Sequence, residues 1–335
     1  MNSSTYTEAS SSASSPIIRA VGDSKIEVND VESGYASAAS SVASSTSSLP
    51  QVILTKPHIK HLNQQLEKLD AVDRLRFVKI LFPNLYQSTA FGLTGLVTID
   101  MLSKIQDEAG SQPVDIVFLD TLYHFQETLD LVDRVKAKYP NNRIHTYRPD
   151  GASSAAEFEE RYGARLYETA PELYDWIAKV EPQQRSYADL GVAAVLTGRR
   201  RSQGGERDQI AFVEVDEERG GIIKINPLVD WTFARVKAYI DEHDVPYNAL
   251  LDRGYKSVGD WHSTSPVDAA EDERAGRWRG QTKTECGIHN KQSRYAQFLQ
   301  AQQQKDDDEK AKLTAALEKV EKEQRNQQPV PLQVV

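Results

Sequence analysis

Apolar runs of strand length alternate with amphipathic stretches through the middle of the chain. The strand-like runs are NLYQSTA (84–90), VDIVFLDT (114–121), RIHTYRP (143–149) and VAAVLTG (192–198). Apolar residues at helical spacing mark 56–81 (ended by Pro83), 92–108, 124–139, 154–187 and 230–243. QIAFVEV and GIIKINPL predict a short antiparallel pair. Strands that alternate with helices predict an α/β fold: a mostly parallel sheet with helices on both faces.

The two ends of the chain depart from this pattern. Residues 1–50 contain 16 Ser and too little apolar surface to offset their ordering entropy, so we expect a disordered Ser-rich arm. Periodicity is weak from 245 to 290. Residues 291–335 are rich in Gln, Lys and Glu and predict a polar helical or disordered tail. One folded domain over 51–290 is therefore expected between two extensions.

Composition narrows the possible functions. Forty Lys+Arg against 49 Asp+Glu give a net charge of −9, which disfavours nucleic acid or anionic lipid as partners. No apolar run approaches the roughly 18 to 20 residues that a membrane helix needs, and no targeting signal stands out, so we expect a cytoplasmic protein. Cys286 is the single cysteine, which excludes internal disulfides and cysteine-ligated clusters. We expect no metal site.

Three predicted loops follow strands, at the edge where open α/β sheets bind ligands. STAFGLTG (88–95) brings hydroxyls and glycines to a helix N-terminus, which favours an anion, although these are also ordinary helix-start residues. DTLYHFQET (120–128) places Asp120 where it suits a ribose or base edge, or caps the next helix. GRRRSQGGER (198–207) carries a charge of +3, and arginine forks bind phosphate or sulfate; a solvated loop is the alternative.

A second basic block surrounds the only cysteine. RAGRWRGQTKTECGIHNKQSR (274–294) holds six Lys or Arg against Glu285. Nearby cations stabilise a thiolate, so Cys286 is a candidate nucleophile rather than a small buried hydrophobe. The two basic clusters and the thiol predict a multiply anionic ligand, of the nucleotide class, with Cys286 delivered to it.

Seven motifs, taken in order, resemble the phosphoadenosine phosphosulfate (PAPS) reductase family. They are STAFG, DIVFLDTLYHFQET, KVEPQQR, GRRRSQGGER, PLVDW, LLDRGYKSVGDWHST and ECGIH, over about residues 85–290. TAFGLTGLVTIDMLSK looks most like the fungal branch. The resemblance implies the adenine-nucleotide α-hydrolase-like fold, related to ATP pyrophosphatases. It also implies a homodimer that reduces PAPS to sulfite and adenosine 3′,5′-bisphosphate in sulfate assimilation, and so in cysteine and methionine biosynthesis, with thioredoxin or glutaredoxin as electron donor.

The resemblance implies roles for individual residues. Cys286 matches the family's nucleophile, which would form an S-sulfocysteine, and His289, three residues on, matches a family position near the site and is expected to be catalytic with it. The other matches are expected to bind substrate: Ser88, Thr89, Phe91 and Gly92 around the nucleotide, Asp120 and Thr121 beside the adenosine, and Lys179, Arg200, Arg201, Arg207 and Tyr255. We assign Arg277 and Arg279 to the 3′-phosphate, because their segment must close over the ligand, and the 199–207 loop to the sulfate.

Related adenylyl-sulfate (APS) reductases carry paired cysteines that hold a [4Fe–4S] cluster, which this sequence lacks; the PAPS branch, without a cofactor, is therefore favoured. Two other classes stay open. An ATP-pyrophosphatase relative that adenylates its substrate would want an SGGxDS-type loop, which STAFGLTG does not match. A nucleotide-binding regulatory module with an incidental cysteine would bind PAPS and release no sulfite.

Overall fold

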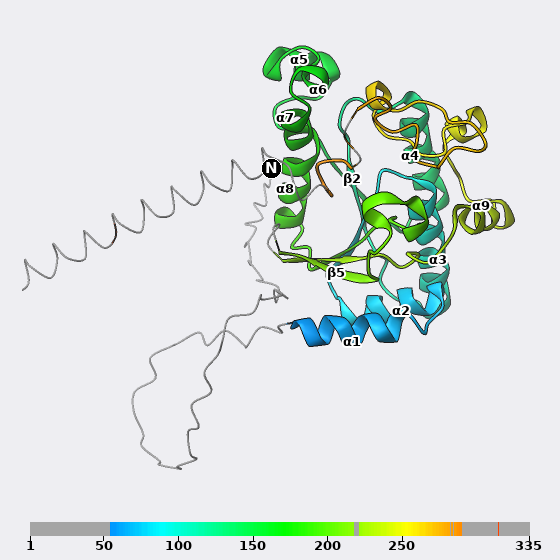
Figure 1. Cartoon of the computed structure of the whole chain (residues 1–335). Helices are drawn as coiled ribbons and strands as arrows, with labels where there is room; N and C mark the ends of the chain where they lie inside the picture. The colour runs from blue at the N-terminus through cyan, green and yellow to red at the C-terminus, as the bar shows by residue number, and fades with distance from the viewer. Residues whose placement is uncertain (1–53, 218–220, 282, 284, 290–313, 315–335) are drawn as a thin grey trace, which may run out of the picture.

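The computed structural model describes residues 54–217, 221–281, 283, 285–289 and 314. Within them, six strands form one sheet in the order β3-β2-β1-β4-β6-β5. Figure 1 shows the sheet among the helices. The strands are β1 (Leu85–Ser88), β2 (Ile116–Leu119), β3 (Ile144–Tyr147), β4 (Ala194–Leu196), β5 (Val213–Asp216) and β6 (Ile222–Ile225). All neighbours are parallel except β5 and β6. The predicted mostly parallel sheet is confirmed, and the predicted antiparallel pair forms one of its edges.

The helices follow the predicted segments with two differences. They are α1 (Lys56–Leu66), α2 (Ala71–Leu81), α3 (Leu93–Ala109), α4 (Gln126–Lys138), α5 (Ala155–Tyr162), α6 (Leu166–Thr169), α7 (Pro171–Asp175), α8 (Glu181–Asp189) and α9 (Phe233–Glu242). The single helix predicted over 56–81 is two helices, because Asp70 caps α2 by accepting from the amide of Asp73. The long stretch predicted over 154–187 is divided into α5 to α8, with a π-helical turn at Trp176–Val180.

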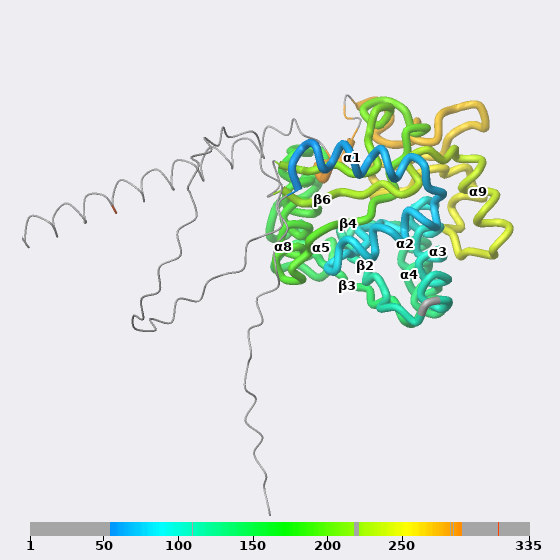
Figure 2. Tube along the Cα trace, turned by 90° about the horizontal axis from the view of Figure 1, so that it is seen from below, coloured from blue at the N-terminus to red at the C-terminus, as the bar shows by residue number. Residues whose placement is uncertain are grey.

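Helices cover both faces of the sheet. α8 contacts β2 and β3, and Figure 2 shows α8 and α5 on one side of the strands and α2, α3 and α4 on the other. α3 packs against both α2 and α9. This arrangement buries every residue of β2, β4 and β6, whereas β3 at the edge of the sheet is only partly buried.

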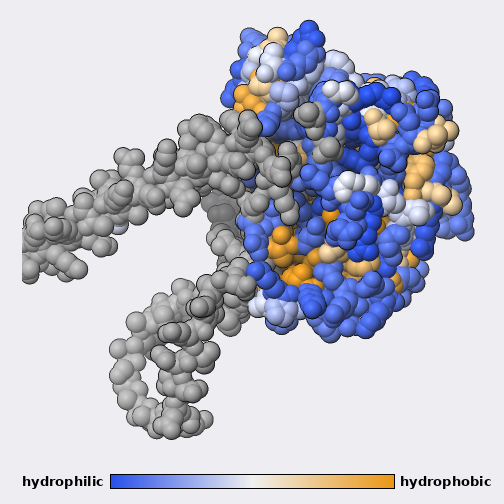
Figure 3. Space-filling view, in the orientation of Figure 1, coloured by the Kyte–Doolittle hydropathy of each residue, from blue (hydrophilic) through white to orange (hydrophobic). Residues whose placement is uncertain are grey.

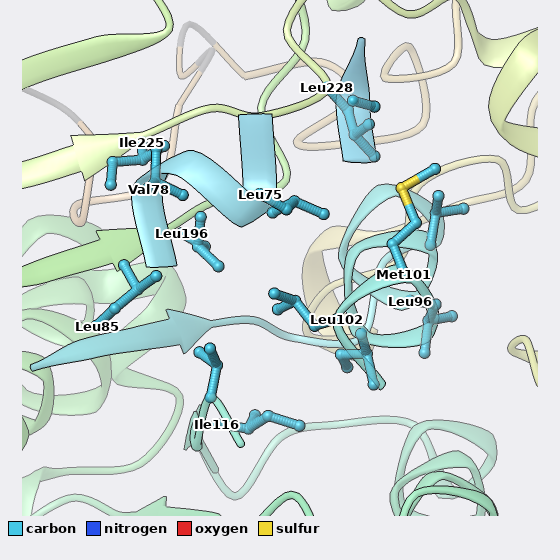
Figure 4. Close-up of a cluster of buried hydrophobic side chains, with 14 of the residues drawn as sticks. Leu75, Val78, Leu85, Leu96, Met101, Leu102, Ile116, Leu196, Ile225 and Leu228 are labelled. Atoms are coloured by element: carbon cyan, nitrogen blue, oxygen red, sulfur yellow. The ribbon is translucent and has the colours of Figure 1, made fainter. Parts of the chain in front are cut away.

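The main core lies between the sheet and the helices α2 and α3 (Figure 4). Strand residues such as Leu85, Ile116 and Leu196 meet Leu75 of α2 and Leu96 of α3 there, and all five are nearly or completely buried. Burying such a side chain contributes about 1.5 to 3 kcal/mol. A smaller, aromatic cluster is formed by residues between 123 and 178, with Tyr123, Phe158 and Tyr174 at its centre.

The face seen in Figure 3 is mostly hydrophilic, with small apolar areas. Across the described residues, no helix is both long enough and apolar enough to cross a lipid bilayer. The arm over 1–50 and the tail over 291–335 lie outside the described residues, apart from Thr314, so the predictions for them stay predictions.

Candidate active site

A cavity lies at the carboxyl ends of β1, β2 and β4. The loop 88–95 after β1, Leu119 and Thr121 from the end of β2, and residues 197–200 after β4 line one side of it. From β1, the sheet extends to β2 and β3 in one direction and to β4 in the other, and such a reversal opens a crevice between the diverging loops. Parts of the irregular segment 248–289 line the remaining side.

The loop after β1 brings backbone close to the cavity. Phe91 has a left-handed backbone (φ +56°), and Gly92 precedes the first turn of α3, which no side chain caps. A Cβ on Gly95 would lie 2.4 Å from Oγ1 of Thr89, and one on Gly198 would lie 3.2 Å from the amide nitrogen of Gly95. Only glycines allow the β1 and β4 loops to approach this closely. The result is an uncapped helix N-terminus, which favours an anion, at one wall of the cavity.

Cys286 is half-buried and lines the opposite wall. Buried charges hold its neighbours on both sides. The Glu285 carboxylate accepts from Nη2 of Arg207 (2.7 Å) and Nη2 of Arg274 (3.2 Å), and the Gly287 amide donates to Oδ2 of Asp175 (2.8 Å). Burial lowers the pKa of Arg274 to about 10, and the nearby guanidinium of Arg207 adds to this effect. The cysteine is therefore presented by a segment that ion pairs tie down.

Lys179 is the buried centre of a second charged cluster. Its Nζ lies 3.0 Å from Oδ1 of Asp175 and 2.8 Å from Oδ2 of Asp260. Burial alone would lower the pKa of Lys179, but the two carboxylates outweigh it and raise the pKa, so the ammonium stays charged. Asp260 also accepts from the hydroxyls of Thr121 (2.6 Å) and Tyr174 (3.1 Å). Lys179 comes from the π-helical turn, a feature often found at functional sites.

Arg200 and Arg207 of the 199–207 loop line the cavity but bind the protein itself. Arg200 is buried, with Nη2 2.8 Å from Oε1 of Glu273 and Nε 2.9 Å from Oγ1 of Thr94. Arg207 donates from both Nε and Nη2 to the two carboxylate oxygens of Glu285. These guanidinium groups thus join the loop to α3 and to the segment that carries Cys286.

Arg277 differs from these arginines. It lines the cavity, and among the described residues it has no carboxylate partner within ion-pair distance. Its Nη1 donates to the carbonyl of Val258 (3.2 Å), its Nε is buried with no hydrogen-bond partner in the described part of the chain, and the guanidinium lies 4.6 Å over the Trp278 ring. Burial lowers the pKa of Arg277, which the negative charge of Asp260 partly offsets. Arg277 is the cation best placed to meet an anion near the thiol.

Three predicted site residues do not line the cavity. The Asp120 carboxylate accepts from Nε of Arg148 (2.8 Å), although its neighbour Thr121 does face the cavity. Arg201 donates from Nε to the carbonyl of Ile210 (2.9 Å), away from the cavity. Arg279 is exposed and pairs with Glu271 (2.9 Å). The grouping of Arg277 with Arg279 is thereby corrected: Arg277 points inward near Cys286, and Arg279 lies outside.

The remaining predicted residues are brought together in the cavity lining: Ser88, Thr89, Phe91, Gly92, Thr121, Lys179, Arg200, Arg207, Tyr255, Arg277, Cys286 and His289. Sequence reasoning missed the acids that organise them, Asp175, Asp260, Glu273 and Glu285. Two of the four left a signal: Asp260 and Glu285 stand inside the motifs, beside the cations, where an acid indicates pairing. Within the described residues, no group of His, Cys, Asp and Glu is arranged to hold a metal ion.

Comparison with known proteins identifies the family that this chain resembles. The family model "Phosphoadenosine phosphosulfate reductase domain" matches residues 84–266. A phosphoadenosine phosphosulfate reductase of Emericella nidulans is 56% identical over 281 residues, which cover 84% of this chain and 90% of the relative. The enzyme of that name from Saccharomyces cerevisiae is 52% identical over 252 residues, or 74% of this chain and 95% of the relative.

A solved structure agrees. The crystal structure of phosphoadenylyl-sulfate (PAPS) reductase from Candida auris, a phosphate complex, is 53% identical, with a TM-score of 0.58, and covers 63% of this chain and 98% of that chain. The predicted adenine-nucleotide α-hydrolase-like fold and the resemblance to fungal members are confirmed. By the match of residues 84–266 and the identity to the fungal relatives, this chain belongs to the phosphoadenosine phosphosulfate reductase family.

Proposed function

We propose that this protein reduces PAPS to sulfite and adenosine 3′,5′-bisphosphate in sulfate assimilation, with electrons from thioredoxin or glutaredoxin. One observation carries the proposal: a half-buried thiol, Cys286, faces a cavity whose other walls are an uncapped helix N-terminus and several cations. Such a cavity suits a nucleotide with several negative charges, and the thiol supplies a nucleophile for its reacting end.

In the first half-reaction, the Cys286 thiolate attacks the sulfur of the sulfate group. A bond forms between Sγ and that sulfur, the bond from sulfur to the bridging oxygen breaks, and the electron pair leaves on the phosphate of adenosine 3′,5′-bisphosphate. An anion that attacks a sulfur ringed by negative oxygens needs cations to neutralise them. Arg277 and Lys179 line the same cavity as Cys286, and we assign this work to them.

In the second half-reaction, a thiolate of the reduced donor protein attacks Sγ of the S-sulfocysteine. Sulfite leaves, a mixed disulfide forms, and the donor's second thiol resolves it and frees Cys286. The donor dithiol thus supplies both electrons, and the scheme requires no cofactor. Because Cys286 is only half-exposed and its neighbours are tied to Asp175 and Arg207, the segment 283–289 has to move before a protein can reach the thiol.

The testing experiment is sulfite release from PAPS and APS, measured side by side with reduced thioredoxin. Without thioredoxin, mass spectrometry of the protein incubated with PAPS should show one sulfonate on Cys286. Cys286→Ser should keep nucleotide binding and lose sulfite release, because a neutral hydroxyl is a poor nucleophile. Turnover that survives alkylation of the thiol would favour an adenylating enzyme. PAPS binding without sulfite would favour a regulatory module.

From the family resemblance we also propose that the protein acts in the cytoplasm as a homodimer. Sedimentation equilibrium of the full chain tests the second point, and a mass of 37.5 kDa at micromolar concentration would contradict it.

A further inference from the structure

Asp175 lies behind the cavity, outside every motif used above and outside the chemistry just described. It ends α7, where the π-helical turn begins, and its side chain is 5% exposed. A buried carboxylate is unfavourable unless it is paired and hydrogen-bonded. The partners of Asp175 therefore indicate what it does.

The partners come from two segments that meet at the thiol. Oδ1 accepts from Nζ of Lys179 (3.0 Å), one turn along the same helical segment. Oδ2 accepts from the backbone amide of Gly287 (2.8 Å) and from the ammonium of Lys283. Gly287 directly follows Cys286, and Lys283 precedes it by three residues. One carboxylate thus holds the cysteine's segment on both sides of the sulfur.

The contact with Gly287 is tight. A Cβ on Gly287 would lie 2.8 Å from Cβ of Asp175 and 3.2 Å from Cγ2 of Val180, so the backbone is pressed against the helical segment. Because Gly287 is the next residue after Cys286, a shift of its amide moves the Cys286 backbone and the sulfur with it.

Charge balance favours this role. Burial alone would raise the pKa of Asp175, but the charges of Lys179 and Lys283 outweigh it and lower the pKa, so the carboxylate is ionised. Lys179 keeps a second carboxylate, Asp260, if Asp175 is lost. Among the described carboxylates, Asp175 alone forms an ion pair with Lys283.

We propose that Asp175 is a positioning residue for the transfer of the sulfonate to Cys286: it fixes the sulfur at its attack position through the Gly287 amide and Lys283. This inference rests on the proposed function. An asparagine at 175 preserves the shape and one acceptor but loses the charge that holds Lys283, so the segment should loosen while the rest of the cavity stays intact.

The test compares two reactions of the same sulfur. In Asp175→Asn, single-turnover sulfonation of Cys286 by PAPS should slow by about 10²-fold, the usual effect of a misplacement of about 1 Å. Alkylation by iodoacetamide should be faster than in the wild type, because the loosened segment is more accessible. Calorimetry should show unchanged binding of adenosine 3′,5′-bisphosphate. Lys283→Met should show the same difference between a slowed sulfonation and a faster alkylation, to a smaller extent. It keeps the test available if Asp175→Asn fails to fold.

Glu271→Gln is the matched control, since it removes a partly exposed carboxylate that pairs with Arg279 outside the cavity, and it should behave as the wild type. Sulfonation at the wild-type rate in Asp175→Asn, or a fall of both reactions in step with the melting temperature, would overturn the inference. A wild type that PAPS does not sulfonate would count against the proposed function instead. In that case, faster alkylation of Asp175→Asn would still support the inference that Asp175 holds the segment that carries Cys286. An unchanged alkylation rate would overturn that inference.

Discussion

Replacing Arg200 by methionine, whose side chain is of similar length, removes the guanidinium and leaves its hydrogen-bond partners in place. Glu273, whose side chain is 8% exposed, loses the group that it binds through both oxygens. Oγ1 of Thr94 and the carbonyl of Trp231 each lose a donor. The change therefore strands a nearly buried carboxylate between α3 and the segment that carries Cys286.

The expected loss can be estimated from these contacts. Removing one partner of a buried ion pair costs about 3 to 5 kcal/mol, because the remaining charge stays away from water. For a domain of this size, each kcal/mol lowers the melting temperature by about 2 to 4 °C, so Arg200→Met should melt roughly 6 to 20 °C below the wild type. Adding Glu273→Gln removes the stranded charge and should recover about 1 to 3 kcal/mol.

Urea denaturation followed by circular dichroism measures both variants. Arg279→Met is the matched control, since it breaks an exposed pair with Glu271 and should change the free energy of unfolding by less than about 1 kcal/mol. If Arg200→Met unfolds at the wild-type urea concentration and only its nucleotide affinity falls, the guanidinium serves the ligand rather than the fold, and the reasoning is refuted.

Three further predictions concern the cavity, pH and the arm. Arg277→Met should slow sulfonation of Cys286 by about 10²-fold with PAPS and APS alike, as loss of one charge-stabilising donor does, and Arg279→Met should not; an effect confined to PAPS would return Arg277 to the 3′-phosphate. Burial lowers the pKa of His262 to about 4. Below about pH 6.5, His262 therefore binds a proton in the unfolded chain but not in the folded one. This group should lower the wild-type free energy of unfolding by about 3 kcal/mol between pH 7 and pH 4. In His262→Gln, the urea midpoint should lack this contribution to the fall. Deletion of residues 1–48 should leave melting temperature and activity unchanged, and a large drop in either contradicts the disordered arm.

The fold was predictable because buried parallel strands are continuous apolar runs. IVFL in β2 is buried at every position, which is why 114–121 was found. The break between α1 and α2 was missed, since Leu69 and Val72 continue the apolar period across it and both pack on the same core. Only the cap made by Asp70 interrupts the helix there, and a cap is a single polar residue within a periodic pattern.

The candidate site was predictable in outline and not in its pairings. Counting charges located the basic loop and the basic block, and the lone thiol marked the centre. A count does not say which cations are already paired. Arg200 meets Glu273 across 73 positions of sequence and Arg207 meets Glu285 across 78, so only the folded chain distinguishes them from Arg277. Long-range ion pairs leave no local pattern.

The π-helical turn makes the length of the segment 171–189 as important as its composition. Such a turn holds one residue more than the helix around it, and each residue turns a helix by about 100°. Lys179, Gln183 and Tyr187 follow at four-residue steps and all line the cavity, and Asp175 lies one step before them and pairs with Lys179. Deleting one residue from 176–178 would let α7 and α8 join as one regular helix, and Tyr174 and Asp175 would then rotate by about a quarter turn relative to the cavity-lining residues of α8. We expect this stretch to accept many substitutions at exposed positions but no insertion or deletion of a single residue.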